Sequence, residues 1–504
     1  MIPRIALLSC GTGRRSFRRP VPQLRSAIRG IMDRRTLLRG AAALAAGTAL
    51  APAVRAAGAL PRRNVLLLIS DDQGLDLGCY GAPISTPRLD RLAREGTRFS
   101  QGFAAVSSCS PSRAVINTGL YTHQNGMYGL QHDVHHQSLL DGIETLPAML
   151  RRAGYATALV GKKHVGPDSA FPYEAELVPE RSGIRDVREL AIAASSFIRS
   201  SDDRPFFVTV AYSDPHRAAV DYGNDRPWPG VKPVSYDPAT VPVPSHLPDI
   251  PVVRGDLAAY YESLSRLDTG VGMILDDLAE TGRADETLVI FLSDNGRPFP
   301  GAKTNLYDAG LHLPLIVRAP GVRPGVNDAM VSWVDLAPTV LDFTGVAPPT
   351  RYPLSGKSLL PLLGRTGAAD RDAVFASHDF HEINQYYPMR AVRTRAHSYI
   401  ANLAFPLDYP IAGDVAGSPS WKAISADPAL RLGKRSQAAY LKRPAEELYD
   451  LARDPDEIDN VAADPTYAPV LADMRRRLQA VRAATHDPWL AGQTDPYAHM
   501  EHQR

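Results

Sequence analysis

The chain has 504 residues and a mass of 54.7 kDa, with 44% hydrophobic and 22% charged residues. At roughly 100–200 residues per domain, this length predicts several domains or one large α/β body with an appendage. The composition excludes a collagen-like, coiled-coil or largely disordered protein, and three cysteines exclude a disulfide scaffold. The formal charge of +2 is uneven, because residues 1–56 hold 11 Arg and one acid, which leaves eight more acids than bases in the remainder. Such a body is not a general nucleic-acid binder.

Residues 1–56 are expected to form an export signal that is cleaved. Paired arginines at 34–35 precede an apolar, alanine-rich stretch at 41–54, and small residues at 54–56 suit a cleavage site. This order is typical of a signal peptide, and the arginine pair resembles a twin-arginine signal. A membrane anchor is the alternative, but about 14 apolar residues are too few to cross ~30 Å of hydrocarbon. We expect Met32 as the start, the twin-arginine export machinery as a partner, and a soluble periplasmic or secreted product.

Residues 62–365 are predicted to form an α/β domain with a large, mostly parallel sheet flanked by helices. Continuous apolar runs are typical of strands buried on both faces. The predicted strands are 64–70, 155–160, 205–212, 287–293 and 313–318, and the predicted helices are 88–96, 111–120, 144–152, 187–199, 257–280 and 335–343. Their alternation indicates a sheet covered by helices on both faces. The polar, proline-rich stretch 214–249 is predicted to be loop.

Residues 366–504 show a different pattern and are predicted to form a smaller α+β subdomain. Short alternating runs at 389–394, 397–403 and 446–451 predict an antiparallel sheet, and a basic amphipathic helix at 469–484 is expected to pack on it. The polar stretch 405–442 is predicted to be loop.

Polar side chains follow several of the predicted parallel strands. These residues are Asp71, Asp72, Lys162, His164, Asp214, His216, Asp294 and Asn295. Because the carboxyl ends of parallel strands share one edge of a sheet, we expect these side chains to meet. Crowded carboxylates without Cys or His ligands favour Ca²⁺, with Mg²⁺ as the alternative, over Zn²⁺.

Cys109 is predicted to lie just before a helix, where free N–H groups favour an anion. Arg113 follows four residues later, on the same helix face. From these residues alone, a buried structural thiol and a thiolate nucleophile both remain open as alternatives.

The sequence Cys-Ser-Pro-Ser-Arg at 109–113, followed by AVINTGLYTHQNG, resembles the signature of type I sulfatases. Gly-Lys-Lys-His at 161–164 and Ser-Asp-Asn-Gly at 293–296 resemble further elements of that family. The resemblance runs from about residue 64 to the C-terminus. It implies an alkaline-phosphatase/sulfatase-like fold, a sulfatase activity, and conversion of Cys109 to Cα-formylglycine by a formylglycine-generating enzyme.

The resemblance also implies a role for each site residue. Formylglycine 109 is the nucleophile as its hydrate and a metal ligand, together with Asp71, Asp72, Asp294 and Asn295. Arg113 and Lys162 stabilise charge on the sulfate, and His164 is the base for elimination. His216 and Lys303 face the leaving group. His132, His381 and Glu382 are candidates for contacts with the sugar, and His132 is alternatively part of a zinc-binding cluster with its neighbouring histidines.

Several stretches resemble the sulfamidase branch of the family, which removes N-linked sulfate from glucosamine of heparan sulfate. They include residues 123–136, 202–217, 293–307 and 485–490. Lys163 stands where many O-sulfatases carry Trp, whereas Lys303 replaces the expected Arg. We therefore expect a sulfohydrolase acting on N-sulfated glucosamine. The alternatives are an O-sulfatase on a related glycan, a phosphodiester or phosphonate hydrolase, and an inactive glycan-binding protein. The oligomeric state stays open, with a homodimer among the alternatives.

Overall fold

An eight-stranded sheet in the order β5-β4-β6-β1-β7-β8-β2-β9 forms the centre of the structure. The computed structural model describes residues 63–179, 184–368 and 370–491, which all belong to one compact unit. Its strands are β1 (Asn64–Ser70), β2 (Thr97–Phe99), β4 (Ala156–Gly161), β5 (Ala175–Leu177), β6 (Phe206–Ala211), β7 (Thr287–Ser293), β8 (Leu315–Arg318) and β9 (Gly325–Asn327). Neighbouring strands from β5 to β7 are parallel, whereas β8 is antiparallel to both β7 and β2. The predicted mostly parallel sheet is confirmed.

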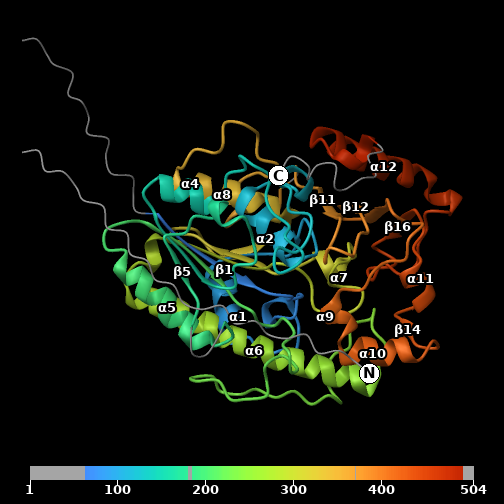
Figure 1. Ribbon diagram of the computed structural model, residues 1–504, viewed down its shortest axis with the longest axis horizontal. Coiled ribbons are helices and arrows are strands. Elements are labelled where there is room, and N and C mark those ends of the chain that lie inside the picture. The colour runs from blue at the N-terminus through green and yellow to red at the C-terminus, as the bar shows by residue number, and fades with distance from the viewer. Residues whose placement is uncertain (1–62, 180–183, 369, 492–504) are drawn as a thin grey trace, which may run out of the picture. The chain divides into compact units, whose positions relative to one another are not determined.

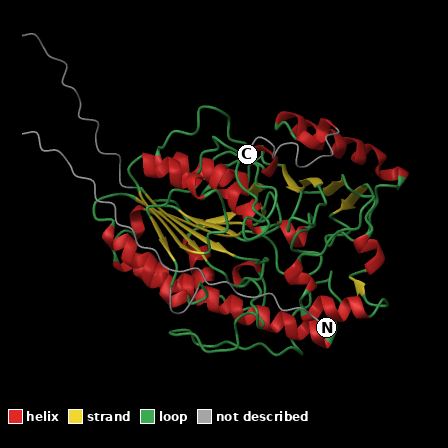
Figure 2. Ribbon diagram, in the orientation of Figure 1, coloured by secondary structure: helices red, strands yellow, loops and turns green. Residues whose placement is uncertain are grey.

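Helices cover both faces of this sheet (Figures 1 and 2). One face carries α1 (Pro87–Glu95), α5 (Val187–Ser200) and α6 (Pro251–Glu280), and the other carries α2 (Cys109–Thr118), α4 (Leu146–Arg152) and α8 (Leu336–Thr344). Short elements nearby are α3 (Thr122–Asn125), α7 (Asp308–Leu311) and the pair of strands β3 (Gly102–Phe103) and β10 (Val331–Ser332). Residues 214–249 contain no helix or strand, as predicted.

The helices α6 and α2 begin more than one residue earlier than predicted. α6 starts at Pro251 and not at residue 257, because proline fits the first helical position, where its missing N–H costs nothing. α2 starts at Cys109 itself, so the thiol lies in the first turn and not before the helix. Gly119 ends α2 in the left-handed conformation, which glycine adopts without strain.

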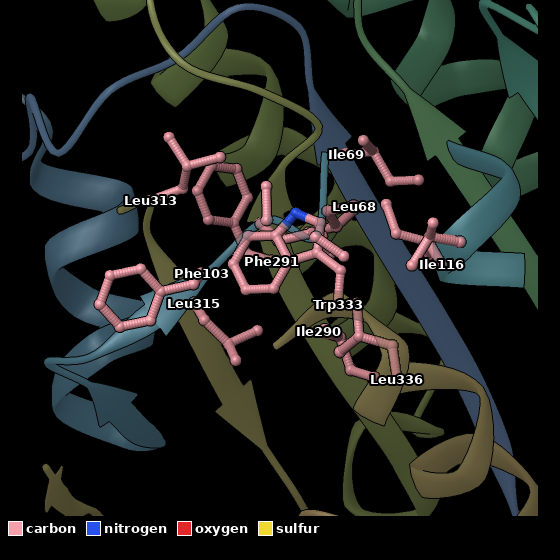
Figure 3. Packing of buried hydrophobic residues seen from close by; sticks show 14 of the residues in the cluster. Leu68, Ile69, Phe103, Ile116, Ile290, Phe291, Leu313, Leu315, Trp333 and Leu336 are labelled. Atoms are coloured by element: carbon pink, nitrogen blue, oxygen red, sulfur yellow. The ribbon is translucent and has the colours of Figure 1, made fainter. Parts of the chain in front are cut away.

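The helices and the sheet share a tightly packed core, part of which is drawn in Figure 3. Leu68 of β1 lies there with Ile116 of α2 and Leu336 of α8, and all three are buried. The indole of Trp333 is fully buried among them, and its N–H donates to the backbone oxygen of Ser293 at 2.9 Å. Since β7 ends at Ser293, this bond fixes the strand end from which the site residues follow.

A second, antiparallel sheet lies in the C-terminal part, as predicted. Its strands are β11 (Ala373–His378), β12 (Met389–Thr394), β13 (His397–Asn402) and β16 (Glu446–Asp450), and α12 (Ala468–Ala484) packs on β12 and β13. β11 was not predicted. Arg390 of β12 is fully buried and pairs with Asp379 at 2.8 Å and with Asp487 at 2.9 Å, which joins the chain beyond α12 to the sheet.

The prediction of a loop at 405–442 is wrong. This segment contains α9 (Gly413–Ala416), α10 (Pro419–Ala426), α11 (Gln437–Leu441) and the hairpin of β14 (Arg431–Leu432) with β15 (Arg435–Ser436). Ser418 caps α10 by accepting from the N–H of Trp421, and Pro419 follows at the first helical position. Ser436 caps α11 in the same way. These start signals outweigh the polar composition of the segment.

The predicted export signal at 1–56 and the candidate start at Met32 lie outside the described residues. Among the residues that the structure describes, none of the helices combines the length and apolarity needed to cross a membrane. The predicted boundary between residues 365 and 366 lies between α8 and β11 and stays a prediction.

Candidate active site

Four adjacent strands end at one edge of the central sheet, and the predicted site residues follow them. β4, β6, β1 and β7 are parallel and in register, so that Gly161 lies opposite Ala211 and Ser70 opposite Ser293. The residues that follow these ends are Lys162, His164, Asp214, His216, Asp71, Asp72, Asp294 and Asn295. Because the strand ends are level, side chains up to about 220 residues apart in sequence meet at this edge, as predicted.

The acidic residues after β1 and β7 are fully buried, and two hydrogen bonds link the ends of the two strands. The N–H of Asp72 donates to Asp294 Oδ1 at 3.1 Å, and Asn295 Nδ2 donates to Asp72 Oδ1 at 2.7 Å. Asp72 has a φ of 61°, a left-handed conformation that costs energy for any residue except glycine. The surrounding hydrogen bonds hold it there, as is common where strain serves a site.

Cys109 points at this carboxylate cluster from the first turn of α2. Its Sγ lies 3.6 Å from Asp71 Oδ1 and 3.8 Å from Asp72 Oδ1, and the residue is 1% exposed. Burial raises the pKa of the Cys109 thiol well above its ordinary value, although Lys303 and Lys162 act in the opposite direction. An unmodified Cys109 is therefore a protonated thiol and a poor nucleophile.

Three cations surround the cluster: Arg113 and Lys303 are buried, and the Lys162 side chain is 16% exposed. Arg113 Nη2 contacts Asp294 at 2.8 Å and Asp71 at 3.3 Å, so this guanidinium pairs with carboxylates rather than with Cys109. Lys162 pairs with Asp71. Burial alone would raise the pKa of Asp71, but Lys162, with His216 and Arg113, holds that pKa well below its ordinary value.

Lys303 bridges two carboxylates with its single ammonium group. Its Nζ lies 2.8 Å from Asp72 Oδ2 and 2.6 Å from Asp414 Oδ2, and the side chain is buried. An ammonium group donates in three directions, so these two bonds leave one donor for a bound ligand. The Lys that replaces the expected Arg therefore keeps the charge but offers no bidentate fork.

The site residues fit a hard divalent cation. Ligand atoms of Asp71, Asp72, Cys109 and His216 lie within 4.8 Å of one another. Asn295 Oδ1 is buried and has no hydrogen-bond partner among the described residues, which suits it to a metal. Asp294 lies beside this group, with its two oxygens accepting from Asp72 N–H and from Arg113.

The charge of the cluster also favours a cation. The carboxylates are Asp71, Asp72, Asp294 and Asp414, and the permanent cations are Arg113, Lys162 and Lys303. The cluster thus carries one surplus negative charge when all carboxylates are ionised. Burial, followed by the charge of Asp71, raises the pKa of Asp294 to about 7, against the effect of Arg113. A divalent cation removes this repulsion and leaves a net positive site for an anion.

Two histidines flank the cluster. His216 Nδ1 lies 2.6 Å from the backbone oxygen of Arg217 and therefore carries a proton, which leaves Nε2 facing Asp72 and Asp414, each at 3.6 Å. His164 Nε2 lies 2.6 Å from His132 Nδ1, and its own Nδ1 has no partner among the described residues. Burial, followed by the nearest lysine, lowers the pKa of both His216 and His164, so both are neutral at neutral pH.

Hydrogen bonds from two arginines fix the backbone around His216. Arg266 donates to both oxygens of the buried Asp214, at 2.7 and 2.8 Å, and Arg185 donates to Asp214 Oδ1 at 2.8 Å. Arg185 also donates to the backbone oxygens of His216 and Arg217 at 2.9 Å. Asp214 thus positions the histidine and does not enter the cluster itself.

The three candidate sugar contacts have different hydrogen-bond partners around the site. The buried His381 bonds through Nδ1 to Ser108 Oγ at 2.8 Å, directly before Cys109. His132 is exposed and contacts His164. Glu382 accepts from the N–H of Gly413 at 2.9 Å and so holds the start of α9.

Sequence reasoning missed Asp414. It lies in α9, inside the segment that was predicted to be loop, and no strand or motif precedes it. Only the fold brings it to Lys303 and His216. The available signal was weak: a Gly-Asp pair at the start of a short helix is typical of many turns.

Comparison with known proteins identifies the family. The family model described as Sulfatase matches residues 63–346, and the model described as N-sulphoglucosamine sulphohydrolase, C-terminal, matches residues 302–405. The chain is 40% identical over 464 residues to human N-sulphoglucosamine sulphohydrolase, covering 85% of this chain and 91% of that protein. It is 29% identical over 472 residues to human arylsulfatase A, covering 83% of this chain and 87% of that protein.

Solved structures confirm the predicted alkaline-phosphatase/sulfatase-like fold. One, in complex with its substrate D-glucosamine-2-N,6-O-disulfate, has a TM-score of 0.63 at 19% identity and covers 86% of this chain and 99% of that chain. The phosphonate monoester hydrolase of Agrobacterium radiobacter has a TM-score of 0.61 at 22% identity and covers 84% of this chain and 96% of that chain. Such identities show the fold alone, whereas the family model spans more than half of the sequence. This chain belongs to the sulfatase family of hydrolases.

Proposed function

We propose that this protein is a sulfohydrolase that removes the N-linked sulfate from glucosamine in heparan-type saccharides. The observation that carries the proposal is the convergence of Arg113, Lys162, Lys303 and His216 around residue 109 and three carboxylates, in a chain 40% identical to N-sulphoglucosamine sulphohydrolase. A buried site of this kind, with cations pointing inward, suits a small, strongly charged group such as sulfate.

Residue 109 and the carboxylates around it form the reacting end of the proposed site. Cys109 is converted to Cα-formylglycine, whose hydrate supplies the attacking oxygen. Asp71, Asp72, Asp294 and Asn295 would hold Ca²⁺, and that ion supplies positive charge toward the nucleophile and the sulfate oxygens. Mg²⁺ is the alternative, but a crowded set of carboxylate and amide oxygens suits the larger ion better.

The remaining side chains divide between the sulfate and the leaving group. Arg113 and Lys162 lie on the sulfate side, where their charge offsets the charge that develops on the sulfate oxygens. His164 is neutral and accepts the proton that is released when sulfate leaves residue 109. Lys303 and His216 lie toward the leaving group. His216 is neutral in the free site, and its side chain is 26% exposed, so that it takes up a proton from solvent; in this protonated form its Nε2 delivers the proton that a departing amine needs.

Export and maturation complete the proposal. The arginine pair and apolar stretch within residues 1–56 support twin-arginine export to the periplasm or beyond, and a formylglycine-generating enzyme is the required maturation partner. Sequencing the N-terminus of the protein isolated from its native host tests the export step. A mature chain that still begins at or before Met32 contradicts it.

The test of function compares two substrates with one enzyme preparation. Peptide mass spectrometry first establishes that residue 109 is formylglycine. Sulfate release is then measured from glucosamine N-sulfate and from N-acetylglucosamine 6-sulfate. We expect faster release from the first. Release from the second alone contradicts the proposal and favours an O-sulfatase, and turnover of aryl phosphodiesters far above both favours a phosphodiester or phosphonate hydrolase.

A further inference from the structure

Asp414 is the carboxylate of the cluster that solvent reaches. Its side chain is 20% exposed, whereas those of Asp71, Asp72 and Asp294 are fully buried. Asp414 Oδ2 accepts from Lys303 Nζ at 2.6 Å and lies 3.6 Å from His216 Nε2. Both neighbours face the leaving group in the proposed function. A substrate that enters the site therefore meets Asp414 on its leaving-group side.

The structure holds this carboxylate in place before any ligand arrives. The Glu382 carboxylate accepts from the N–H of Gly413, and a Cβ on Gly413 would force this carboxylate to move away. Gln385 donates to the backbone oxygen of Ile411 at 3.0 Å, which fixes the chain ahead of α9. Asp414 Oδ1 accepts from the N–H of Val415 at 2.9 Å. Such support is what a specificity contact requires.

The unused hydrogen-bonding capacity of Asp414 matches one feature of an N-sulfate. Each carboxylate oxygen can accept two hydrogen bonds. Lys303 donates one to Oδ2 and the N–H of Val415 donates one to Oδ1, so each oxygen can accept one more. The bridging nitrogen of a sulfamate carries an N–H, whereas the bridging oxygen of a sulfate ester carries only lone pairs. A carboxylate attracts the first and repels the second.

We propose that Asp414 determines specificity by accepting a hydrogen bond from the N–H of the sulfamate, and so favours N-linked over O-linked sulfate. This inference rests on the proposed function. In the reaction, the S–N bond breaks and the nitrogen takes a proton from Nε2 of His216 in its protonated form, which returns that ring to the neutral form with its proton on Nδ1, while Asp414 keeps its hydrogen bond to the N–H already present. The amine thus leaves with both protons accounted for, and Asp414 stays ionised throughout.

The experiment compares Asp414→Asn with the unchanged protein on glucosamine N-sulfate and on 4-nitrophenyl sulfate, whose leaving group has no N–H. We expect the loss of kcat/KM on the N-sulfate to exceed that on the aryl sulfate by about tenfold or more, as for a lost hydrogen bond to a charged group. Asp408→Asn is the matched control, because Asp408 lies on the same segment, is 78% exposed and, within the described part of the chain, forms an ion pair with the exposed Lys442 alone. It should change neither rate.

A binding measurement makes the test independent of turnover. In the Cys109→Ala background, Asp414→Asn should weaken binding of glucosamine N-sulfate by about tenfold and that of inorganic sulfate far less. Equal losses for both ligands, or for both substrates, overturn the proposal and leave Asp414 as a support for Lys303. An Asp414→Asn variant with unaltered rates and affinities overturns the proposal as well. If the protein without this substitution releases no sulfate from glucosamine N-sulfate, the proposed function itself has failed, and this outcome is seen separately from any effect of Asp414→Asn.

Discussion

The two sides of the candidate active site are built in different ways. On one side, Asp71, Asp72 and Asp294 follow fully buried parallel strands whose register sets their positions. On the other side, Asp414 and Glu382 come from a short helix and a loop, which are held by individual hydrogen bonds. In the proposed function, the comparison teaches that sulfate chemistry depends on the central sheet, whereas the surroundings of the leaving group depend on segments that can change in evolution without disturbing the sheet.

The largest effect is expected from Cys109→Ala, at the centre of the sheet side. Removal of the residue that carries the proposed nucleophile should lower turnover by on the order of 10³-fold or more. The fold should persist, because only one sulfur atom is lost from a buried position. Sulfate release and thermal unfolding, measured on the same preparation, check both statements. Substantial residual turnover would sink the assignment of residue 109.

Asp294→Ala tests whether the sheet side carries metal and activity together. The variant removes one of the proposed oxygen ligands and leaves the buried Arg113 with Asp71 alone, at 3.3 Å. We expect bound calcium and activity to fall in parallel, and the free energy of unfolding to fall by about 3–5 kcal/mol. Metal analysis and urea unfolding measure these changes.

The control for this variant is Asp276→Ala, because Asp276 pairs with Arg88 at the surface. Its loss should cost less than about 1 kcal/mol and spare activity. Normal activity and normal calcium content in Asp294→Ala would contradict the metal assignment.

Arg390→Ala tests the C-terminal sheet, where we expect a substitution to lower stability without lowering the activity of the folded protein. Asp379 and Asp487 would stay buried without their shared guanidinium. Unfolding free energy should drop by about 3–5 kcal/mol, whereas the folded fraction keeps its activity. Arg475→Ala is the matched control, since its pair with Glu446 is exposed and should contribute less than about 1 kcal/mol. Similar stability losses in both variants would refute the role of the buried network.

The smallest expected effect concerns pH and His378 at the end of β11. Burial, followed by Arg443, lowers the pKa of His378 to about 3. The unfolded chain, with a histidine pKa near 6.5, therefore binds more protons than the folded protein between pH 6.5 and 3. Stability is present above this window and is lost as pH falls through it. His378→Leu should flatten the fall of the melting temperature, whereas the exposed His136→Leu should not. A slope unchanged by His378→Leu would contradict this account.

The sheet side could be predicted from sequence because its signals are local. Apolar runs identified β1, β6 and β7 closely, and the polar residues after them could be placed by the rule that parallel strands end at one edge. For Asp72 and Asp294, the position directly after a predicted strand was enough to place them at this edge. The start of α2 was misplaced because Cys109 and Ser110 carry weak helix signals, although Cys109 takes the first helical position.

The C-terminal side could be predicted only in outline. β12, β13, β16 and α12 have a clear period, but β11 does not, and α9 is a four-residue helix that tertiary contacts stabilise. Asp414 therefore had no signal of its own. The contact of His381 with Ser108 likewise had no signal in the sequence, because it joins two side chains that are 273 positions apart.

The burial of α2 determines when Cys109 can be modified relative to folding. All ten residues of this helix are buried, Cys109 among them, so a modifying enzyme cannot reach the thiol once the chain has folded. The proposed conversion of Cys109 to formylglycine would therefore have to come first, during or soon after synthesis. Under that proposal, a chain that folds with an unmodified thiol stays inactive for its whole lifetime. The fraction of active enzyme would then depend on the rate of modification relative to the rate of folding.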